Sequence, residues 1–256
     1  MTFRKSSMIS RTLLALVFSL FAAATFGEPL RVALSPDYMP LAFEQDGELR
    51  GIEVDNAREV GKILGRPVEF VPMNSTAYID ALNSGDVDVV MGGYSITPER
   101  SAQVDFARSF MTIGQMAIIL AERAGPLSYP RALFQKGIKI AVEPGTTGQS
   151  YVLESYPLAD FRMYNTPNDA FEALRKREVD VYIHDAPTSW NLASSRENQD
   201  LLSLYRPLTR EELAWAVKKG NKELLQQLND ALSELESNGR LSAIQNYYIP
   251  VTVQVR

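Results

Sequence analysis

Arg100 is the residue of this sequence with the clearest chemical use. It follows a short turn after an apolar segment over residues 87–91, which has the composition of a buried strand. Open α/β folds bind ligands at the carboxyl ends of their parallel strands. A guanidinium is a planar fork of N–H donors that can grip a carboxylate through two parallel hydrogen bonds. The position therefore predicts a carboxylate clamp, and the alternative is a solvated surface arginine.

A carboxylate stands at the equivalent place in the second half of the chain. Asp185 follows an expected strand over residues 179–183. A carboxylate that is removed from water needs a cationic partner. The same residue, with Ala186 and Pro187 behind it, also fits the N-cap of a helix that has proline in its first turn. Both roles stay open, and one residue can fill both.

Small and hydroxyl-bearing residues follow other strands of the predicted sheets. Gly93 permits close approach of the backbone to a ligand, and Ser95 offers a hydroxyl and an N–H. Gly145, Thr146 and Thr147 lie between an expected strand and an expected helix, so the free N–H groups of the helix start would point at an anion. The alternative is an ordinary strand-to-helix turn with a capping threonine.

These side chains must be positioned by alternating strands and helices. The apolar patterns predict strands over residues 30–34, 68–71, 87–91, 114–120, 138–142, 179–183 and 213–217. They predict helices over residues 54–64, 77–82, 149–155, 167–177 and 222–236. Such alternation requires crossover connections and hence a parallel sheet with helices on its faces. The pattern restarts near residue 114, which indicates two α/β lobes.

The start of the chain is typical of a secretory signal peptide. Residues 1–27 combine a basic head, an apolar run and a small-residue exit. The run is shorter than the roughly 18–20 residues that span a bilayer. The whole chain has 26 basic residues against 31 acidic ones, which argues against nucleic acid and anionic membranes as partners. It has no cysteine, so the fold has to be stable without disulfides.

Several motifs occur in a fixed order along the rest of the chain. They are Asp37-Tyr38-Met39-Pro40, Gly51-Ile52-Glu53-Val54-Asp55, Gly85-Asp86-Val87-Asp88, Ser95-Ile96-Thr97-Pro98-Glu99-Arg100, Val104-Asp105-Phe106, Gly145-Thr146-Thr147 and Val179-Asp180 with His184-Asp185. This series resembles the bacterial extracellular solute-binding proteins of family 3, the polar-amino-acid type. Within that family it looks closest to glutamine-binding proteins.

The resemblance implies the periplasmic binding protein type II fold, in which two doubly wound α/β lobes are joined by two hinge strands. The crossings would lie near residues 113–117 and 211–215. After the signal peptide, residues 28–114 and 212–256 would form lobe one, and residues 115–211 would form lobe two. A ligand in the cleft would draw the lobes together by hinge closure.

The resemblance also implies roles for individual residues. Arg100 would hold the carboxylate of the ligand, and Thr147 would join it from the opposite lobe. Asp185 would pair with the α-ammonium group. Tyr38 would pack against the ligand side chain, but Ser75 stands where the family usually has a second stacking aromatic.

Three further positions concern the ligand side chain. By resemblance, Glu143 and His184 would face it. Ser35 stands where binders of lysine and arginine use an acidic residue, which argues against a purely cationic ligand. These departures leave the side-chain specificity open.

Together, the residues and the resemblance predict a periplasmic protein that captures a zwitterionic amino acid for a membrane ABC permease. We expect a monomer that uses no cofactor or metal and catalyses no reaction. A single histidine and no cysteine give little support to metal clusters or Ser-His-Asp arrangements. One alternative is a cyclohexadienyl dehydratase-like enzyme acting on prephenate or arogenate, with Glu143 or Asp185 as the acid. Another is a freestanding ligand sensor.

Overall fold

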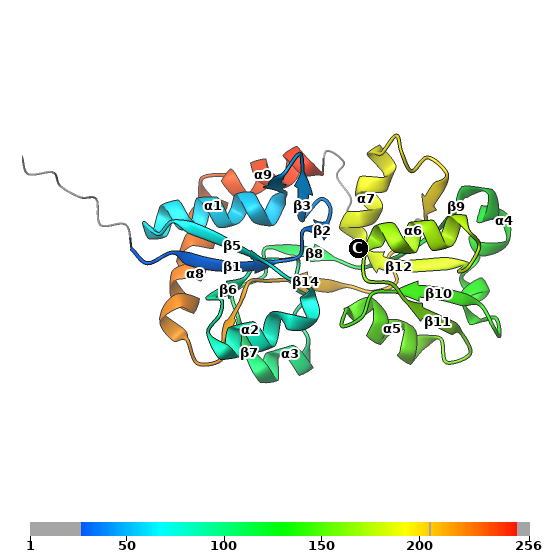
Figure 1. Cartoon of the computed structure of the whole chain (residues 1–256), viewed down its shortest axis with the longest axis horizontal. Coiled ribbons are helices and arrows are strands. Elements are labelled where there is room, and N and C mark those ends of the chain that lie inside the picture. Colours follow the sequence, from blue (N-terminus) through cyan, green and yellow to red (C-terminus); the bar gives the residue numbers. More distant parts are fainter. Residues whose placement is uncertain (1–26, 205, 250–256) are drawn as a thin grey trace, which may run out of the picture.

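The computed structural model describes residues 27–204 and 206–249, which form two lobes (Figure 1). Each lobe is built on a five-stranded sheet with helices on both faces. Nearly all of the expected signal peptide, residues 1–26, lies outside the described residues, as do residues 250–256 of the expected lobe one. The α/β class predicted from the sequence is therefore confirmed.

Lobe one contains the first sheet. Its strands, in spatial order, are β5 (Val68–Pro72), β1 (Leu30–Leu34), β6 (Val89–Val90), β15 (Ala216–Lys218) and β7 (Val104–Phe106). Its helices are α1 (Ile52–Leu64), η1 (Ser75–Ala77), α2 (Tyr78–Ser84), α3 (Pro98–Gln103), α8 (Lys222–Ser237) and α9 (Arg240–Tyr248). A small antiparallel sheet consists of β2 (Asp37–Tyr38), β3 (Ala42–Gln45) and β4 (Glu48–Arg50). Figure 1 shows α1 and α9 on one side of the main sheet and α2 and α3 on the other.

Lobe two repeats this plan. Its strands, in spatial order, are β11 (Asp160–Met163), β10 (Lys139–Val142), β12 (Val181–Asp185), β9 (Gln115–Leu120) and β13 (Leu201–Ser203). Its helices are η2 (Ala121–Arg123), α4 (Ala124–Leu127), η3 (Pro130–Phe134), α5 (Thr147–Ser155), α6 (Pro167–Arg175) and α7 (Ala186–Ser194). One apolar cluster packs α5 against the sheet, and a second packs α6 and α7 against its other face.

The expected parallel pairing is present in both sheets, and each sheet also contains one reversed strand. In lobe one, β15 runs antiparallel to β6 and β7. In lobe two, β9 runs antiparallel to β12 and β13. Both reversed strands follow the segments that connect the lobes and enter their sheets without a crossover helix, which is why the alternation rule does not apply to them.

Two short strands lie side by side between the lobes. β8 (Met111–Ile113) pairs antiparallel with β14 (Glu211–Leu213), with Glu211 opposite Ile113. The expected single strand over residues 213–217 is thus divided into β14 and β15. The buried residues Ala214 and Trp215 connect the two.

Local signals explain most helix boundaries. A side-chain oxygen of Thr97, Thr146, Thr166 or Asn221 caps the helix that follows it. Helix α1 begins after Gly51, two residues earlier than its apolar period predicts. Gly51 has φ +125°, and a Cβ atom there would lie 2.3 Å from the carbonyl oxygen of Leu41, so only glycine fits this entry.

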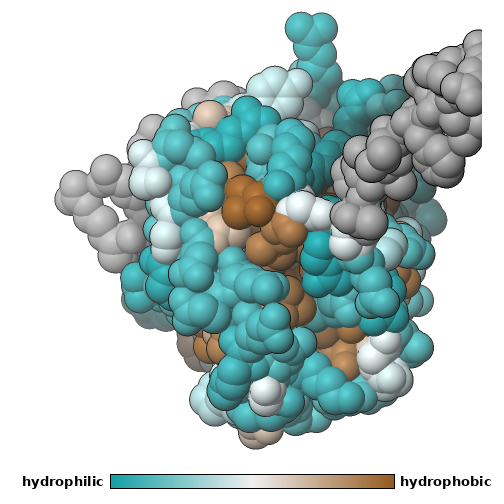
Figure 2. All heavy atoms as spheres, turned by 90° about the vertical axis from the view of Figure 1, so that its left-hand side faces the viewer, coloured by the Kyte–Doolittle hydropathy of each residue, from teal (hydrophilic) through white to brown (hydrophobic). Residues whose placement is uncertain are grey.

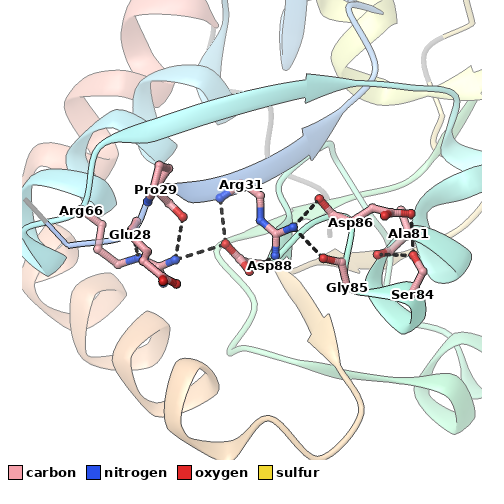
Figure 3. A network of polar contacts seen from close by, with 9 residues as sticks. All are labelled: Glu28, Pro29, Arg31, Arg66, Ala81, Ser84, Gly85, Asp86 and Asp88. Atoms are coloured by element: carbon pink, nitrogen blue, oxygen red, sulfur yellow. Dashed lines mark hydrogen bonds and ion pairs between the residues drawn. The ribbon is translucent and has the colours of Figure 1, made fainter.

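Asp88, the last residue of the Gly85-Asp86-Val87-Asp88 motif, has a structural role in lobe one. Asp88 accepts hydrogen bonds from the backbone N–H of Arg31 at 2.9 Å, from the Arg31 guanidinium at 2.7 Å and from Arg66 at 3.1 Å (Figure 3). Arg31 also donates to the carbonyl oxygen of Gly85 at 2.6 Å. Burial opposes ionisation of Asp88, but the hydrogen bonds from Arg31 and the charges of Arg31 and Arg66 together outweigh it and lower the pKa of the carboxyl.

Asp180 does the same in lobe two. It accepts from the backbone N–H of Lys139 at 3.0 Å and forms an ion pair with Arg123. Arg31 lies at the start of β1 and Lys139 at the start of β10, which are equivalent strands of the two sheets. Asp88 therefore joins the start of β1 to the segment before β6, and Asp180 joins the start of β10 to the segment before β12. These motif residues hold the sheets together at a distance from the cleft described below.

The free end of lobe one is mainly hydrophilic. Figure 2 shows this end, where hydrophilic residues surround a narrow hydrophobic strip. Among residues 27–204 and 206–249, no helix is long and apolar enough to cross a membrane.

Candidate functional site

A cavity of about 50 Å³ lies between the lobes. Residues of both lobes line it, and all nine residues singled out from the sequence are among them. The complete lining consists of Ser35, Asp37, Tyr38, Ser75, Tyr78, Gly92, Gly93, Tyr94, Ser95, Arg100, Glu143, Thr146, Thr147, Asn165, Pro167, His184 and Asp185. We call this space the cleft pocket.

Arg100 enters the cleft pocket from lobe one on α3. Its guanidinium donates to the carbonyl oxygen of Ser95 at 2.9 Å and, across the cleft, to that of Gly145 at 3.0 Å. The guanidinium carbon lies 3.9 Å from the ring centroid of Tyr94, a cation–π contact that fixes its plane. Two of the five N–H donors are thereby used. The remaining donors are available to an anion in the pocket.

Asp185 enters the pocket from the opposite lobe, at the end of β12. It is the N-cap residue of α7, but its side chain makes no capping hydrogen bond. The carboxylate instead accepts from the hydroxyl of Tyr38, across the cleft, and from the amide of Gln115. Burial, with a further contribution from the charge of Glu211, raises the pKa of Asp185 to about 6, although the charge of His184 opposes this. A cation in the pocket would therefore find a poorly solvated carboxylate.

Glu211, on β14, joins the two lobes and was not predicted from the sequence as a site residue. Its carboxylate accepts from Ser95 of lobe one at 2.7 Å and from Thr147 of lobe two at 2.7 Å. It also accepts from Thr209 at 2.6 Å and from the side-chain amide of Gln115 at 3.1 Å. Because the hydroxyls of Ser95 and Thr147 donate to Glu211, they can present only lone pairs to a ligand. They therefore suit an ammonium group better than a carboxylate.

Thr146 and Thr147 differ in their roles at the start of α5. The Thr146 hydroxyl accepts from the N–H of Gln149 at 3.2 Å and donates to the carbonyl oxygen of Glu143 at 2.7 Å, so it is a helix cap. The N–H groups of the first helical turn have no acceptor within the helix. Thr147, the first residue of α5, can thus offer a backbone donor to an anion.

Glu143 and His184 form one group on the lobe-two wall. Oε1 of Glu143 accepts from the hydroxyl of Tyr182 at 2.6 Å and lies 3.2 Å from Nε2 of His184. The edge of Tyr38 packs on the His184 ring at a centroid distance of 5.1 Å. Burial lowers the pKa of His184, but the charge and hydrogen bond of Glu143 together with the contributions of Asp185 outweigh it, so the pKa of His184 is raised.

Gly93 is held in place by a buried carboxyl that the sequence reasoning also missed. Its N–H donates to Glu53 at 2.9 Å, and the indole of Trp215 donates to the other oxygen of Glu53 at 3.0 Å. Gly93 has φ +67°, and a Cβ atom there would lie 2.5 Å from Leu41 and 2.6 Å from Tyr38. Burial raises the pKa of Glu53 to about 7. Glu53 thus links α1, Gly93 in the pocket wall and the connection between β14 and β15.

The residues that sequence reasoning missed lack an obvious local signal. Gln115 begins the strongly apolar strand β9, and Glu211 lies within the segment predicted to cross between the lobes. A polar residue that is buried at a predicted crossing could have been noted as a candidate. Glu53 lies in a recognised motif, but the motif does not reveal its partners. In the described part of the chain, no three acidic, histidine or cysteine side chains are grouped so that they could hold a metal ion.

Comparison with known proteins defines the class of protein. Residues 30–251 match the bacterial extracellular solute-binding proteins, family 3. The chain belongs to this family.

Individual relatives span most of the chain. The L-cystine-binding protein TcyJ of Escherichia coli (strain K12) is 28% identical over 225 residues, which cover 88% of this chain and 84% of the relative. The glutamine-binding protein GlnH of Bacillus subtilis (strain 168) is 29% identical over 206 residues, covering 79% and 74%. These relatives are named as binding proteins for different amino acids.

Solved structures share the fold. The ancestral amino acid-binding protein AncCDT-1, described as a precursor of cyclohexadienyl dehydratase, has 31% sequence identity and a TM-score of 0.81, with 86% of this chain and 95% of that chain covered. An ancestral arginine-binding protein bound to arginine has 30% identity and a TM-score of 0.80, covering 87% and 99%. The predicted type II periplasmic binding protein fold and the family are thus confirmed.

Proposed function

We propose that this protein captures an amino acid between its lobes and delivers it to the membrane permease of an ABC importer. One observation carries the proposal. Arg100 from lobe one and the poorly solvated Asp185 from lobe two line the same pocket. A guanidinium and a carboxylate on opposite walls are complementary to the two charges of a zwitterion.

The contacts of the pocket suggest how the ligand lies. Its carboxylate would take the free N–H donors of Arg100 and the N–H of Thr147. Its ammonium group would bind Asp185 and the lone pairs of the Ser95 and Thr147 hydroxyls, behind which Glu211 lies. The Tyr38 hydroxyl, which donates to Asp185, would have to share or yield that contact.

Binding would act through hinge closure. A ligand shifts the equilibrium between open and closed lobes only by contacts that the closed form gains. Arg100 on one lobe, with Asp185 and Thr147 on the other, would supply such contacts, because the open form separates the lobes. The paired strands β8 and β14 are the candidate hinge, with lobe one formed by residues 28–114 and 212–256 and lobe two by residues 115–211.

The family and the start of the sequence support export. The chain belongs to a family of extracellular solute-binding proteins, and residues 1–27 have the composition of a cleaved secretory signal peptide. We therefore place the protein in the periplasm, as a monomer that docks on its permease.

Isothermal titration calorimetry of the purified protein tests the proposal. Protein that has been unfolded and refolded to remove carried-over ligand is titrated with each of the twenty common amino acids. We expect heat from binding at a single site, and we expect Arg100→Ala to weaken this binding about a hundredfold or more, because an unpaired buried carboxylate costs about 3 kcal/mol or more. Arg50→Ala, a substitution of an exposed arginine paired with Glu48, is the control. Unchanged affinity in Arg100→Ala would refute the carboxylate clamp.

A dehydratase is the second candidate. It is favoured by the raised pKa of Asp185, which makes this carboxyl a possible proton donor near neutral pH. Incubation of the protein with prephenate, followed by assay for phenylpyruvate, separates the candidates. We expect no product above the uncatalysed rate, and catalytic turnover would favour the enzyme.

A further inference from the structure

A second cavity adjoins the cleft pocket. This adjoining cavity has a volume of about 60 Å³ and is lined by Ser35, Asn74, Ser75, Thr76, Glu143, Pro144 and Asn165. It shares Ser35, Ser75, Glu143 and Asn165 with the cleft pocket, whereas Arg100 and Asp185 line only the cleft pocket. A ligand whose α-groups bind Arg100 and Asp185 would therefore point its side chain toward the shared residues.

The wall of the adjoining cavity is polar. Apart from Pro144, the side chains of the adjoining cavity are hydroxyls, amides and one carboxylate. Among the described residues that line the two cavities, Arg100 is the one lysine or arginine. The described residues at the far end of the site thus offer hydrogen-bond acceptors and a negative charge, and they include no lysine or arginine for an acidic side chain.

The carboxylate of Glu143 has one oxygen that can bind a ligand. Oε1 is fixed by Tyr182 and His184, whereas Oε2 accepts no hydrogen bond from the part of the chain that the structure describes. The side chain is 17% exposed, so the free oxygen can be desolvated by a ligand. Glu143 of lobe two supplies a negative charge where the ligand side chain would end, whereas Ser35 of lobe one is neutral.

The cleft pocket has more carboxylates than cations, and a bound zwitterion would leave this excess of negative charge unchanged. Asp37, Glu143 and Asp185 line the cleft pocket, and Arg100 and His184 are the cations available among its described lining residues. Glu211 adds another carboxylate directly behind Ser95 and Thr147. Even with His184 charged, carboxylates outnumber cations, and a zwitterion adds no net charge. A ligand with one extra positive charge reduces the imbalance and gains from the field of the site.

From the adjoining cavity, the free oxygen of Glu143 and the excess of carboxylates, we infer that the ligand is a dibasic amino acid whose side-chain guanidinium or ammonium group binds Glu143. This inference rests on the proposed function, since it takes Arg100 and Asp185 as the partners of the α-groups. The sequence resembles glutamine-binding proteins, and the inference differs from that resemblance in the charge of the ligand side chain.

The test compares ligands of equal shape and different charge. L-Arginine and L-citrulline differ by the replacement of a charged guanidinium by a neutral ureido group. Calorimetric titration measures the affinity of both for the wild-type protein and for Glu143→Gln, with L-lysine, L-glutamine and L-glutamate as further probes. We expect arginine or lysine to bind at least about tenfold more tightly than citrulline and glutamine, because a charge-assisted hydrogen bond is stronger than a neutral one. We expect no measurable binding of glutamate.

The Glu143→Gln variant locates the effect. We expect its preference for arginine over citrulline to fall below about threefold, since the carboxylate that distinguishes them is gone. Should this variant fail to fold, as judged by its circular dichroism, the wild-type comparison decides by itself. Citrulline or glutamine binding as tightly as arginine, with binding still dependent on Arg100, would overturn the inference and leave the proposed function standing. Absence of binding by every amino acid would instead overturn the proposed function.

Discussion

The hydroxyl of Tyr38, on lobe one, donates a hydrogen bond to the carboxylate of Asp185, on lobe two. This bond crosses the cleft at the place where the proposed ligand would put its ammonium group. The carboxylate is therefore kept satisfied while it is buried, and a ligand gains only the difference between its own contact and that of Tyr38. Two measurable consequences concern Asp185 and its neighbour Glu211.

The affinity for an amino acid should fall in mild acid. Burial raises the pKa of Asp185 to about 6, and only the ionised form attracts an ammonium group. Binding thus favours loss of the proton, and the affinity should decrease about tenfold from pH 7 to pH 5. The amino and carboxyl groups of the ligand do not titrate in this range.

Asp185→Asn is the control for the pH dependence. His184, Glu143 and Glu211 also face this region, and the raised pKa of His184 makes its protonation a competing cause. Calorimetry at several pH values should show a weaker but flatter profile in the variant. A variant that keeps the full slope would assign the effect to His184.

Glu211→Gln should weaken ligand binding about tenfold, because the closed form loses charge-assisted bonds to Ser95 and Thr147 that join the lobes. Glu212→Gln is a matched control on the same strand, since its carboxylate accepts from Ser109 and from Thr112 of β8 instead. Titration of both variants with one amino acid tests this. Equal losses of affinity would show that Glu211 has no special part in closure.

The stability of lobe one should depend on pH through Glu53. Its folded-state pKa of about 7 lies above the ordinary glutamate value, so the folded protein holds this proton between pH 4.5 and 7 while the unfolded chain releases it. The contribution of Glu53 to the free energy of unfolding is therefore largest in acid and decreases as the pH rises, by up to about 3 kcal/mol.

Urea unfolding of the wild type and of Glu53→Gln at pH 5 and pH 8 measures this contribution. The variant places an amide N–H₂ against one of the two donors, Gly93 or Trp215, so it should be less stable at pH 5. The difference should shrink at pH 8. A difference that is the same at both pH values would mean that Glu53 does not titrate in this range.

Asp88→Asn and Asp180→Asn should both destabilise the protein by about 1–3 kcal/mol without changing ligand affinity by more than about twofold. Each aspartate ties the start of one strand to an arginine and lies outside the cleft pocket. Thermal unfolding and calorimetry check the two effects separately. A large loss of affinity in either variant would connect these motifs to the site after all.

The sequence predicted the wall of the pocket well, because its residues follow the ends of strands. Arg100, Ser95 and Gly93 come after β6, Thr147 after β10, and Asp185 ends β12. Parallel strands bring their carboxyl ends to one edge, so position along the chain is enough to place such residues together.

Contacts between distant segments could not be predicted in this way. Glu211 meets Ser95 and Thr147 only because β14 runs beside β8, and the partners of Gln115 come from three different segments. The reversed strands β9 and β15 likewise depend on how the chain passes between the lobes. Periodicity describes one segment at a time and contains no such information.

The central claim is that Arg100 and Asp185 hold opposite ends of one amino acid. The most direct measurement is a calorimetric comparison of the best-binding amino acid with its α-carboxamide, in the wild type, Arg100→Ala and Asp185→Asn. Amidation removes the group that Arg100 is proposed to hold and leaves the ammonium in place. It should weaken binding to the wild type and to Asp185→Asn by at least about thirtyfold, and it should scarcely affect the weak binding of Arg100→Ala. An equal loss in all three proteins would contradict the account.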